Sequence, residues 1–91
     1  MNNINELKRL SRELKPSVRI GKKGLSDNLI EEVKKAFKKN RIVKIKLLKS
    51  FPVNSKEALN ELVRIISQKT GSRVIQVIGN SFSLYKEKDF R

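Results

Sequence analysis

The apolar residues of this chain recur at two spacings, and the change from one spacing to the other divides the sequence into short elements. Intervals of three and four residues, which place side chains on one side of a helix, occur in residues 4–14, 29–37 and 58–66. Alternating positions, which place side chains on one face of a strand, occur in residues 18–20, 42–48, 73–78 and 81–86. The pattern predicts the element order α-β-α-β-α-β-β.

Prolines and capping residues predict where the helices begin and end. Pro16 disfavours a helical conformation for the residue before it, so the first helix should end near Leu14. Ser26 or Asp27 can cap the second helix, because short polar side chains accept hydrogen bonds from the free N–H groups of a first turn. Asn54 can cap the third helix for the same reason.

The connections between the strands predict a mixed sheet. A helix lies between the first and second strands and another between the second and third, which favours a parallel portion. Gly79 and Asn80 form a two-residue connection between the last two strands, which is typical of an antiparallel hairpin. We expect an α/β fold with a four-stranded mixed sheet, built as a single domain over residues 1–91.

One face of this sheet should be apolar and the other polar and basic. The apolar face is predicted to consist of Val18, Ile20, Val43, Ile45, Leu47, Ile75, Val77, Phe82 and Leu84. The reverse face is predicted to consist of Arg19, Lys44, Lys46, Gln76, Ser83 and Tyr85. A basic face with an exposed tyrosine could hold RNA by charge and stacking, and it could equally be an ordinary solvent-facing surface.

Composition removes several classes of chemistry. The chain has no cysteine and no histidine, so it has no disulfides and lacks the commonest general base and metal ligands. The nine carboxylates are scattered or paired with lysines along helices, and nothing groups two of them for acid–base work. The sequence also contains no Walker motif or nucleophile elbow, and we expect no enzymatic activity. There is no signal peptide and no apolar run long enough to span a membrane. We therefore expect a cytoplasmic monomer without cofactor, membrane or small-molecule substrate.

Charge indicates the kind of partner. The net charge is +13, from 22 lysines and arginines against 9 acidic residues. The first 49 residues hold fifteen of the basic and five of the acidic side chains, a net of +10. Such an excess repels itself in a compact protein, and a polyanion relieves that repulsion. Nucleic acid is the expected partner, bound mainly by the first half of the chain.

The segment Gly21-Lys22-Lys23-Gly24 lies between a predicted strand and the start of a predicted helix. Glycine at both ends allows positive φ and close approach of another backbone. The following helix offers free N–H groups and a partial positive charge, which together favour phosphate. By similar logic, KH domains hold an RNA backbone with a G-x-x-G loop. The segment predicts a phosphate site with two lysines at its tip.

Further basic residues should extend this site into a track. On the first helix Lys8, Arg9, Arg12 and Lys15 fill the flank beside the apolar stripe. Their grouping leaves like charges close together, which an external anion would relieve. The residues expected to bind RNA are Gly21, Lys22, Lys23 and Gly24, extended by Arg9, Arg12, Lys15, Arg19 and Lys44.

Residues 14–26 read L-K-P-S-V-R-I-G-K-K-G-L-S. This segment resembles the opening of CRM domains (chloroplast RNA splicing and ribosome maturation), whose pattern is K-P-x-V-x-x-G-x-x-G-[LV]-[ST]. The likeness continues through residues 43–47 and 77–85, so it covers almost the whole chain in order. The interior of the loop, Lys22-Lys23, is more basic than in some members.

The resemblance implies a fold similar to the C-terminal domain of translation initiation factor 3. It also implies RNA binding through the G-x-x-G loop. Stand-alone prokaryotic members are associated with precursors of the large ribosomal subunit, so we expect rRNA as the partner and ribosome assembly as the role. Three alternatives stay open: a DNA-coating chromatin protein of the Alba type, an RNA-processing enzyme component, and a module that recognises acidic protein partners.

Overall fold

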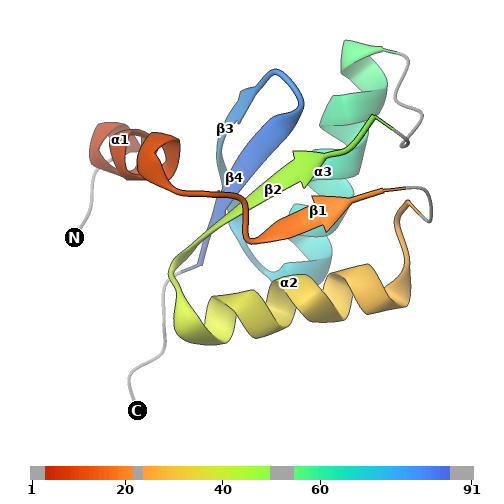
Figure 1. Cartoon of the computed structure of the whole chain (residues 1–91), viewed down its shortest axis with the longest axis horizontal. Coiled ribbons are helices and arrows are strands. Elements are labelled where there is room, and N and C mark those ends of the chain that lie inside the picture. Colours follow the sequence, from red (N-terminus) through yellow and green to blue (C-terminus); the bar gives the residue numbers. More distant parts are fainter. Residues whose placement is uncertain (1–3, 22–23, 50–54, 87–91) are drawn as a thin grey trace.

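The computed structural model describes residues 4–21, 24–49 and 55–86, and it confirms the predicted order of elements within them. The elements are α1 (Ile4–Glu13), β1 (Val18–Ile20), α2 (Asp27–Lys39), β2 (Ile42–Leu47), α3 (Lys56–Thr70), β3 (Arg73–Ile78) and β4 (Ser81–Tyr85) (Figure 1). Strands β2 and β4 each end one residue earlier than predicted. None of the helices in these residues is long and apolar enough to cross a membrane.

The strands form a four-stranded mixed sheet in the order β1-β2-β4-β3, as the α/β prediction required. Strands β1 and β2 are parallel, with Val18 opposite Ile45. Strand β4 is antiparallel to both of its neighbours, β2 and β3. Gly79 has φ +56° in the turn between β3 and β4, a conformation that glycine adopts without strain. The hairpin therefore places β4 in the middle of the sheet and β3 at its edge.

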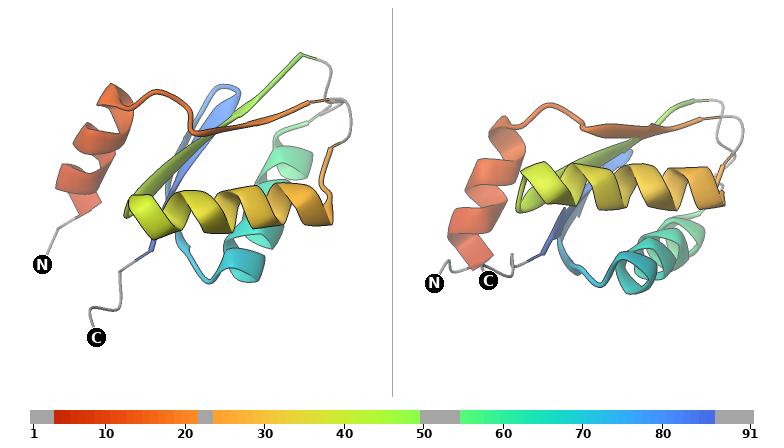
Figure 2. Two further views of the ribbon diagram at one scale, coloured as in Figure 1. Left: turned by 60° about the horizontal axis from the view of Figure 1, so that its bottom comes forward. Right: turned by 90° about the horizontal axis from the view of Figure 1, so that it is seen from below.

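Two helices cover one face of the sheet and the third packs on the other. Helices α2 and α3 lie side by side, and α1 stands apart from them (Figure 2). The main core lies between the sheet and α2 and α3, because the apolar faces of all three meet there. Its largest fully buried side chains are Phe82, Ile20, Ile45, Ile66 and Leu84.

Serine side chains cap two of the helices. The Ser26 hydroxyl accepts a hydrogen bond from the Leu29 N–H (3.2 Å), which confirms one of the two predicted caps of α2. The Ser55 hydroxyl accepts one from the Ala58 N–H (3.1 Å) and caps α3. The prediction that Asn54 caps α3 is therefore wrong by one residue, and Asn54 itself lies outside the described residues.

A bulge in β3 corrects the predicted faces of the sheet. The pairing of β3 with β4 shifts between Val74 and Gln76, so one extra residue is inserted and the alternation of side chains slips. As a result Ile75 does not join Phe82 in the main core, as predicted. It packs instead on the opposite face in a second apolar cluster with Leu7 and Ile42.

Helix α1 is docked onto that second cluster by apolar and polar contacts. Leu7 is buried there, and the half-buried ring of Tyr85 packs against it. The Gln76 side-chain amide donates to the Lys8 carbonyl (3.1 Å) and to the hydroxyl of the wholly buried Ser11 (2.6 Å). The prediction of an exposed tyrosine is therefore wrong, because α1 covers the part of the polar face where Tyr85 lies.

Candidate nucleic-acid interface

The loop after β1 lies at the end of the molecule where several elements converge. Because β1 and β2 are parallel, their carboxyl ends meet at one edge, and α2 and α3 both begin there (Figures 1 and 2). The Gly24 N–H donates to the Gly21 carbonyl (2.9 Å), and Gly24 has φ +64°. That closed turn requires the left-handed conformation that glycine tolerates. Lys22 and Lys23, between the two glycines, lie outside the described residues.

A shallow hollow of about 320 Å³ adjoins this turn. Arg19, Gly21 and Gly24 line it together with residues from the start of α2, which include Glu32. The start of α2 carries the positive end of the helix dipole, but Asp27 in its first turn already offsets part of it. The α2 side of this region therefore carries carboxylates, Asp27 and Glu32, that oppose the binding of an anion there.

The part of the polar sheet face that α1 leaves uncovered is basic. We call it the open face and define it by Arg19, Lys44, Lys46 and Ser81. Arg19 on β1 lies in register with Lys46 on β2, and both side chains are exposed. Lys46 in turn lies in register with Ser81 on β4. Three neighbouring strands therefore present two exposed cations and a hydroxyl on one surface.

Lys44 is fixed in position at the edge of the open face. Its ammonium donates to the Leu14 carbonyl (3.3 Å), and its own carbonyl accepts from the Ser17 N–H (2.8 Å). The side chain is half-buried. A lysine ammonium has three donors, so this contact leaves donors for an anion. The segment between α1 and β1 thus holds the Lys44 ammonium at the surface.

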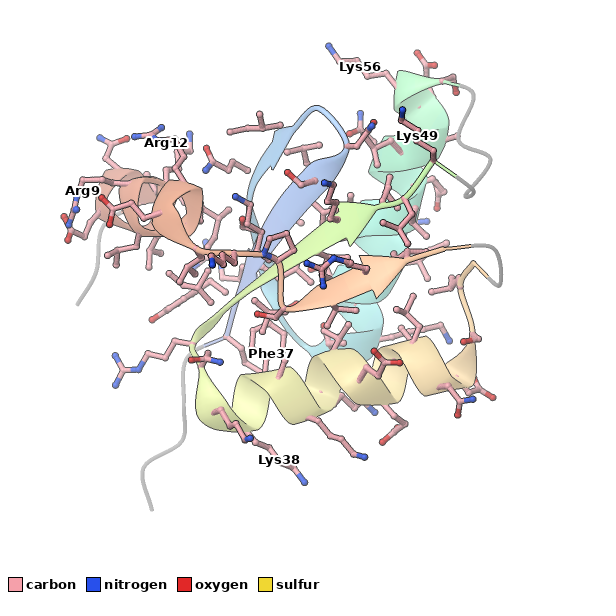
Figure 3. All side chains as sticks on the ribbon, in the orientation of Figure 1. Arg9, Arg12, Phe37, Lys38, Lys49 and Lys56 are labelled. Carbon is pink, nitrogen blue, oxygen red and sulfur yellow. The ribbon has the colours of Figure 1, made fainter. Side chains whose placement is uncertain are left out.

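Arg12 reaches the same surface from α1, whereas Arg9 does not. Arg12 and Lys44 both line a hollow of about 270 Å³ between α1 and the β3–β4 hairpin. Arg9 makes ion pairs within its own helix to Glu6 (2.7 Å) and Glu13 (3.6 Å). The hydrogen bond and charge of Glu6 raise the pKa of Arg9 above its ordinary value. Arg9 lies on the side of α1 farthest from the sheet (Figure 3).

The remaining predicted residue on this side is Lys15, which is exposed in the segment between α1 and β1. The structure therefore brings Arg12, Arg19 and Lys44 together on one face, with Lys15 in the connecting segment. It separates Arg9 from them, because α1 turns that position outward.

Three further lysines were not among the predicted site residues. Lys46 lies on the open face, Lys49 follows β2, and Lys56 lies in the first turn of α3 (Figure 3). Lys49 lies just beyond the carboxyl end of β2, which is beside that of β1, whereas the Lys56 side chain points away from the loop after β1. The parallel alignment of β1 with β2 was the signal for Lys49, since it places residues after β2 beside residues after β1.

Comparisons with known proteins give the chain a family. The family model for the CRS1/YhbY (CRM) domain matches residues 2–86. The chain is 30% identical over 81 residues to "Probable RNA-binding protein YqeI" of Bacillus subtilis. The aligned region covers 89% of this chain and 80% of that protein.

The fold has a counterpart among solved structures. The solution structure of the hypothetical protein SAV1595 from Staphylococcus aureus, described as a candidate RNA-binding protein, has a TM-score of 0.79 and 26% identity with this chain. The similarity covers 96% of this chain and 86% of that one. The sequence match, the fold and the closed glycine turn after β1 agree, and this protein belongs to the CRS1/YhbY (CRM) domain family.

Proposed function

We propose that this protein is a non-catalytic RNA-binding protein that associates with precursors of the large ribosomal subunit. The observation that carries the proposal is the separation of charge on the sheet. The four strands contain no carboxylate, and the uncovered part of their polar face presents cations and hydroxyls together with the exposed Ile78. The acidic residues of the described chain lie on the three helices. A surface of one sign suits a polyanion.

Binding would proceed mainly by neutralising phosphates. The loop with Lys22 and Lys23 would contact the backbone at one end, and Gly21 and Gly24 would allow it to approach closely. Arg12, with the cations of the open face, would hold the backbone farther along, extended by Lys15. Phosphate contacts fix position and carry little sequence information, so structured RNA would be recognised by shape.

The relatives support an RNA partner, and the sequence resemblance extends the proposal to one kind of RNA. The B. subtilis and S. aureus relatives are both named for RNA binding. The resemblance of residues 14–26 to stand-alone prokaryotic CRM domains points to large-subunit precursors. From the composition and the resemblance to stand-alone members, we also propose that the protein is a cytoplasmic monomer.

The surroundings of the loop favour binding over catalysis. General acid–base chemistry needs titratable groups within reach of each other. Of the described residues that line the hollow beside Gly21 and Gly24, Glu32 is the one carboxylate. Across the part of the chain that the structure describes, no three acidic, histidine or cysteine side chains gather as a metal site would require.

Competition between RNA and DNA tests the proposed function. Labelled protein is bound to duplex DNA at fixed salt and challenged with one of two competitors of equal charge, a structured fragment of large-subunit rRNA or unlabelled duplex DNA. The rRNA fragment should displace the protein at a lower competitor concentration than the duplex DNA. A shape-reading surface distinguishes the A-form backbone and its 2′-hydroxyls from B-form DNA. Equal competition by both nucleic acids would instead favour a DNA-coating chromatin protein.

The contrast between Arg12 and Arg9 gives a matched pair of variants on one helix. We expect Arg12→Gln to lower the log–log salt dependence of RNA binding by about 0.7–0.9, the contribution of one phosphate contact. Arg9→Gln removes the same charge but should leave the slope unchanged, since Arg9 is paired with Glu6 and Glu13. Fluorescence anisotropy titrations over a salt series measure both slopes, and equal effects would show that α1 binds RNA with its outer side.

A further inference from the structure

The hollow between α1 and the β3–β4 hairpin has a composition that phosphate binding alone does not require. Besides Arg12 and Lys44 it is lined by Gln76, Ile78, Ser81, Phe82 and Ser83. Its volume of about 270 Å³ lies just below the range of roughly 300–1,000 Å³ that is usual for small-molecule pockets. The space suits a group of the size of one nucleobase, and not a larger ligand.

Ser83 supplies a buried polar group at the floor of this hollow. The residue is 2% exposed. Within the described residues its hydroxyl has no hydrogen-bond partner, unlike that of Ser11, which donates to the Lys8 carbonyl and accepts from Gln76. No wholly inaccessible side-chain polar atom in the described chain lacks a partner, so the Ser83 hydroxyl must open into the hollow. Buried polar groups are nearly always satisfied, and a ligand in the hollow would satisfy this one.

The rim combines an apolar flank with fixed cations. Ile78, the last residue of β3, is 52% exposed and offers an apolar surface beside the polar side chains of the hollow. Arg12 and the ammonium of Lys44, which is held by the Leu14 carbonyl, also line the hollow. A nucleotide site needs three parts, which are an apolar surface for the base ring, a hydrogen-bonding group for the base edge and cations for the phosphate. Ile78, the Ser83 hydroxyl and the pair Arg12 and Lys44 supply them here.

A second hollow of about 230 Å³ adjoins the first and shares Lys44 and Ser81 with it. It adds Pro16, Lys46 and Asn80 and so continues onto the open face. A nucleotide in the first hollow would therefore have its strand running over Lys46 toward the loop at Gly21 and Gly24. The geometry allows one RNA strand to contact both places.

We propose that this hollow binds one unpaired nucleotide of the RNA, with the base against Ile78, its edge on the Ser83 hydroxyl and its phosphate on Arg12 and Lys44. A paired base cannot enter, because its edge and faces are occupied within the helix, whereas an unpaired base can be turned outward. The inference rests on the proposed function and narrows it. The preferred RNA is a helix interrupted by a bulged or looped-out nucleotide.

Two RNA hairpins that differ by one nucleotide test this site. One is fully paired, and the other carries a single bulged 2-aminopurine in the same stem. Wild-type protein should bind the bulged hairpin about fivefold more tightly, because the unpaired base removes apolar surface of its own ring and of Ile78 from water. The 2-aminopurine fluorescence should also change on binding.

Variants on the two sides of one strand separate the site from general binding. Ile78→Ser and Ser83→Ala should each reduce the ratio of the affinities for the bulged and the paired hairpin toward one. Both variants should keep the wild-type affinity for the paired hairpin, and this unchanged affinity also shows that they fold. Val77→Ser is the matched control, since Val77 is the next residue, is 37% exposed and faces the other side of the sheet. It should keep the full preference.

The outcomes distinguish this site from the proposed function. Equal binding of both hairpins by wild type, or a preference that survives both site variants, would overturn the nucleotide site and leave phosphate-based RNA binding standing. Failure to bind either hairpin at low salt would overturn the proposed function and the nucleotide site with it.

Discussion

Replacing Lys22 and Lys23 together by alanine is expected to weaken the binding of structured RNA by at least about tenfold at low salt, since a hydrogen bond to a charged group contributes roughly 1.5–3 kcal/mol. The log–log dependence of affinity on salt should fall by about 1.4–1.8, because each lost phosphate contact lowers the slope by roughly 0.7–0.9. The fold should be unaffected, because the turn itself is closed by the Gly21 carbonyl and the Gly24 N–H. Anisotropy titrations at several salt concentrations, with a structured rRNA fragment as the probe, provide both quantities.

The matched control for this double variant removes the same charge elsewhere. Lys35 and Lys39 are exposed on the second half of α2, which packs on the sheet face opposite the open face. Replacing both by alanine should change the salt slope far less than the loop variant does. A loop variant with unchanged affinity, or a control with an equal loss, would remove the loop from the mechanism.

The largest effect on stability is expected for Phe82→Ala. Phe82 is 1% exposed on the central strand β4, between Ile45 on β2 and Val77 on β3, under α2 and α3. Truncating a buried phenylalanine removes apolar burial and leaves a cavity, which typically costs about 3–5 kcal/mol. A domain of this size has roughly 5–15 kcal/mol in total, so the variant should be close to unfolding.

Urea unfolding followed by circular dichroism measures this loss, and Val77→Ala is its control. Val77 is the register partner of Phe82 on the same face but is 37% exposed, so its truncation should cost less than about 1 kcal/mol. RNA binding should fall in Phe82→Ala only in proportion to the unfolded fraction. A loss below about 1 kcal/mol for Phe82→Ala would contradict the position of β4 at the centre of the core.

Local sequence patterns were sufficient to predict the helices and strands but not to predict which of them pack against each other. Alternation in residues 42–48 and the Gly79-Asn80 turn predicted β2 and the β3–β4 hairpin closely, because both depend on interactions between residues near in sequence. Periodicity shows which side of an element is buried but not what buries it. The docking of α1 over Tyr85 depends on the Gln76 contacts to α1, which join residues more than 60 positions apart.

The face of Ile75 could not be predicted for a related reason. Its alternation with Val77 implies the main core, but the bulge between Val74 and Gln76 moves it to the opposite face. A bulge leaves no reliable mark in a single sequence when no glycine occupies it. The packing of Ile75 against Leu7 on α1 is therefore visible only in three dimensions.

For the candidate site, the basic residue types could be predicted from the sequence, but which of them lie near one another could not. Arg12, Arg19 and Lys44 were predicted from charge and alternation, and they do share one surface. Arg9 shared the same helical flank, but the carboxylates at intervals of three and four residues on either side bind it and hold it outward. Alternation predicted Ser83 on the polar face, but the burial of its hydroxyl and the lack of a hydrogen-bond partner among the described residues depend on the packing of the strands and of α1.

Crosslinking of the protein to RNA in its native cells, followed by sequencing of the recovered RNA, is the most direct test of binding to large-subunit precursors. We predict that precursors of large-subunit rRNA dominate the recovered RNA and that the Lys22→Ala, Lys23→Ala variant recovers much less of them. Recovery of mainly tRNA or intron RNA, with large-subunit precursors no more abundant than in an uncrosslinked control, would contradict the proposed role in ribosome assembly.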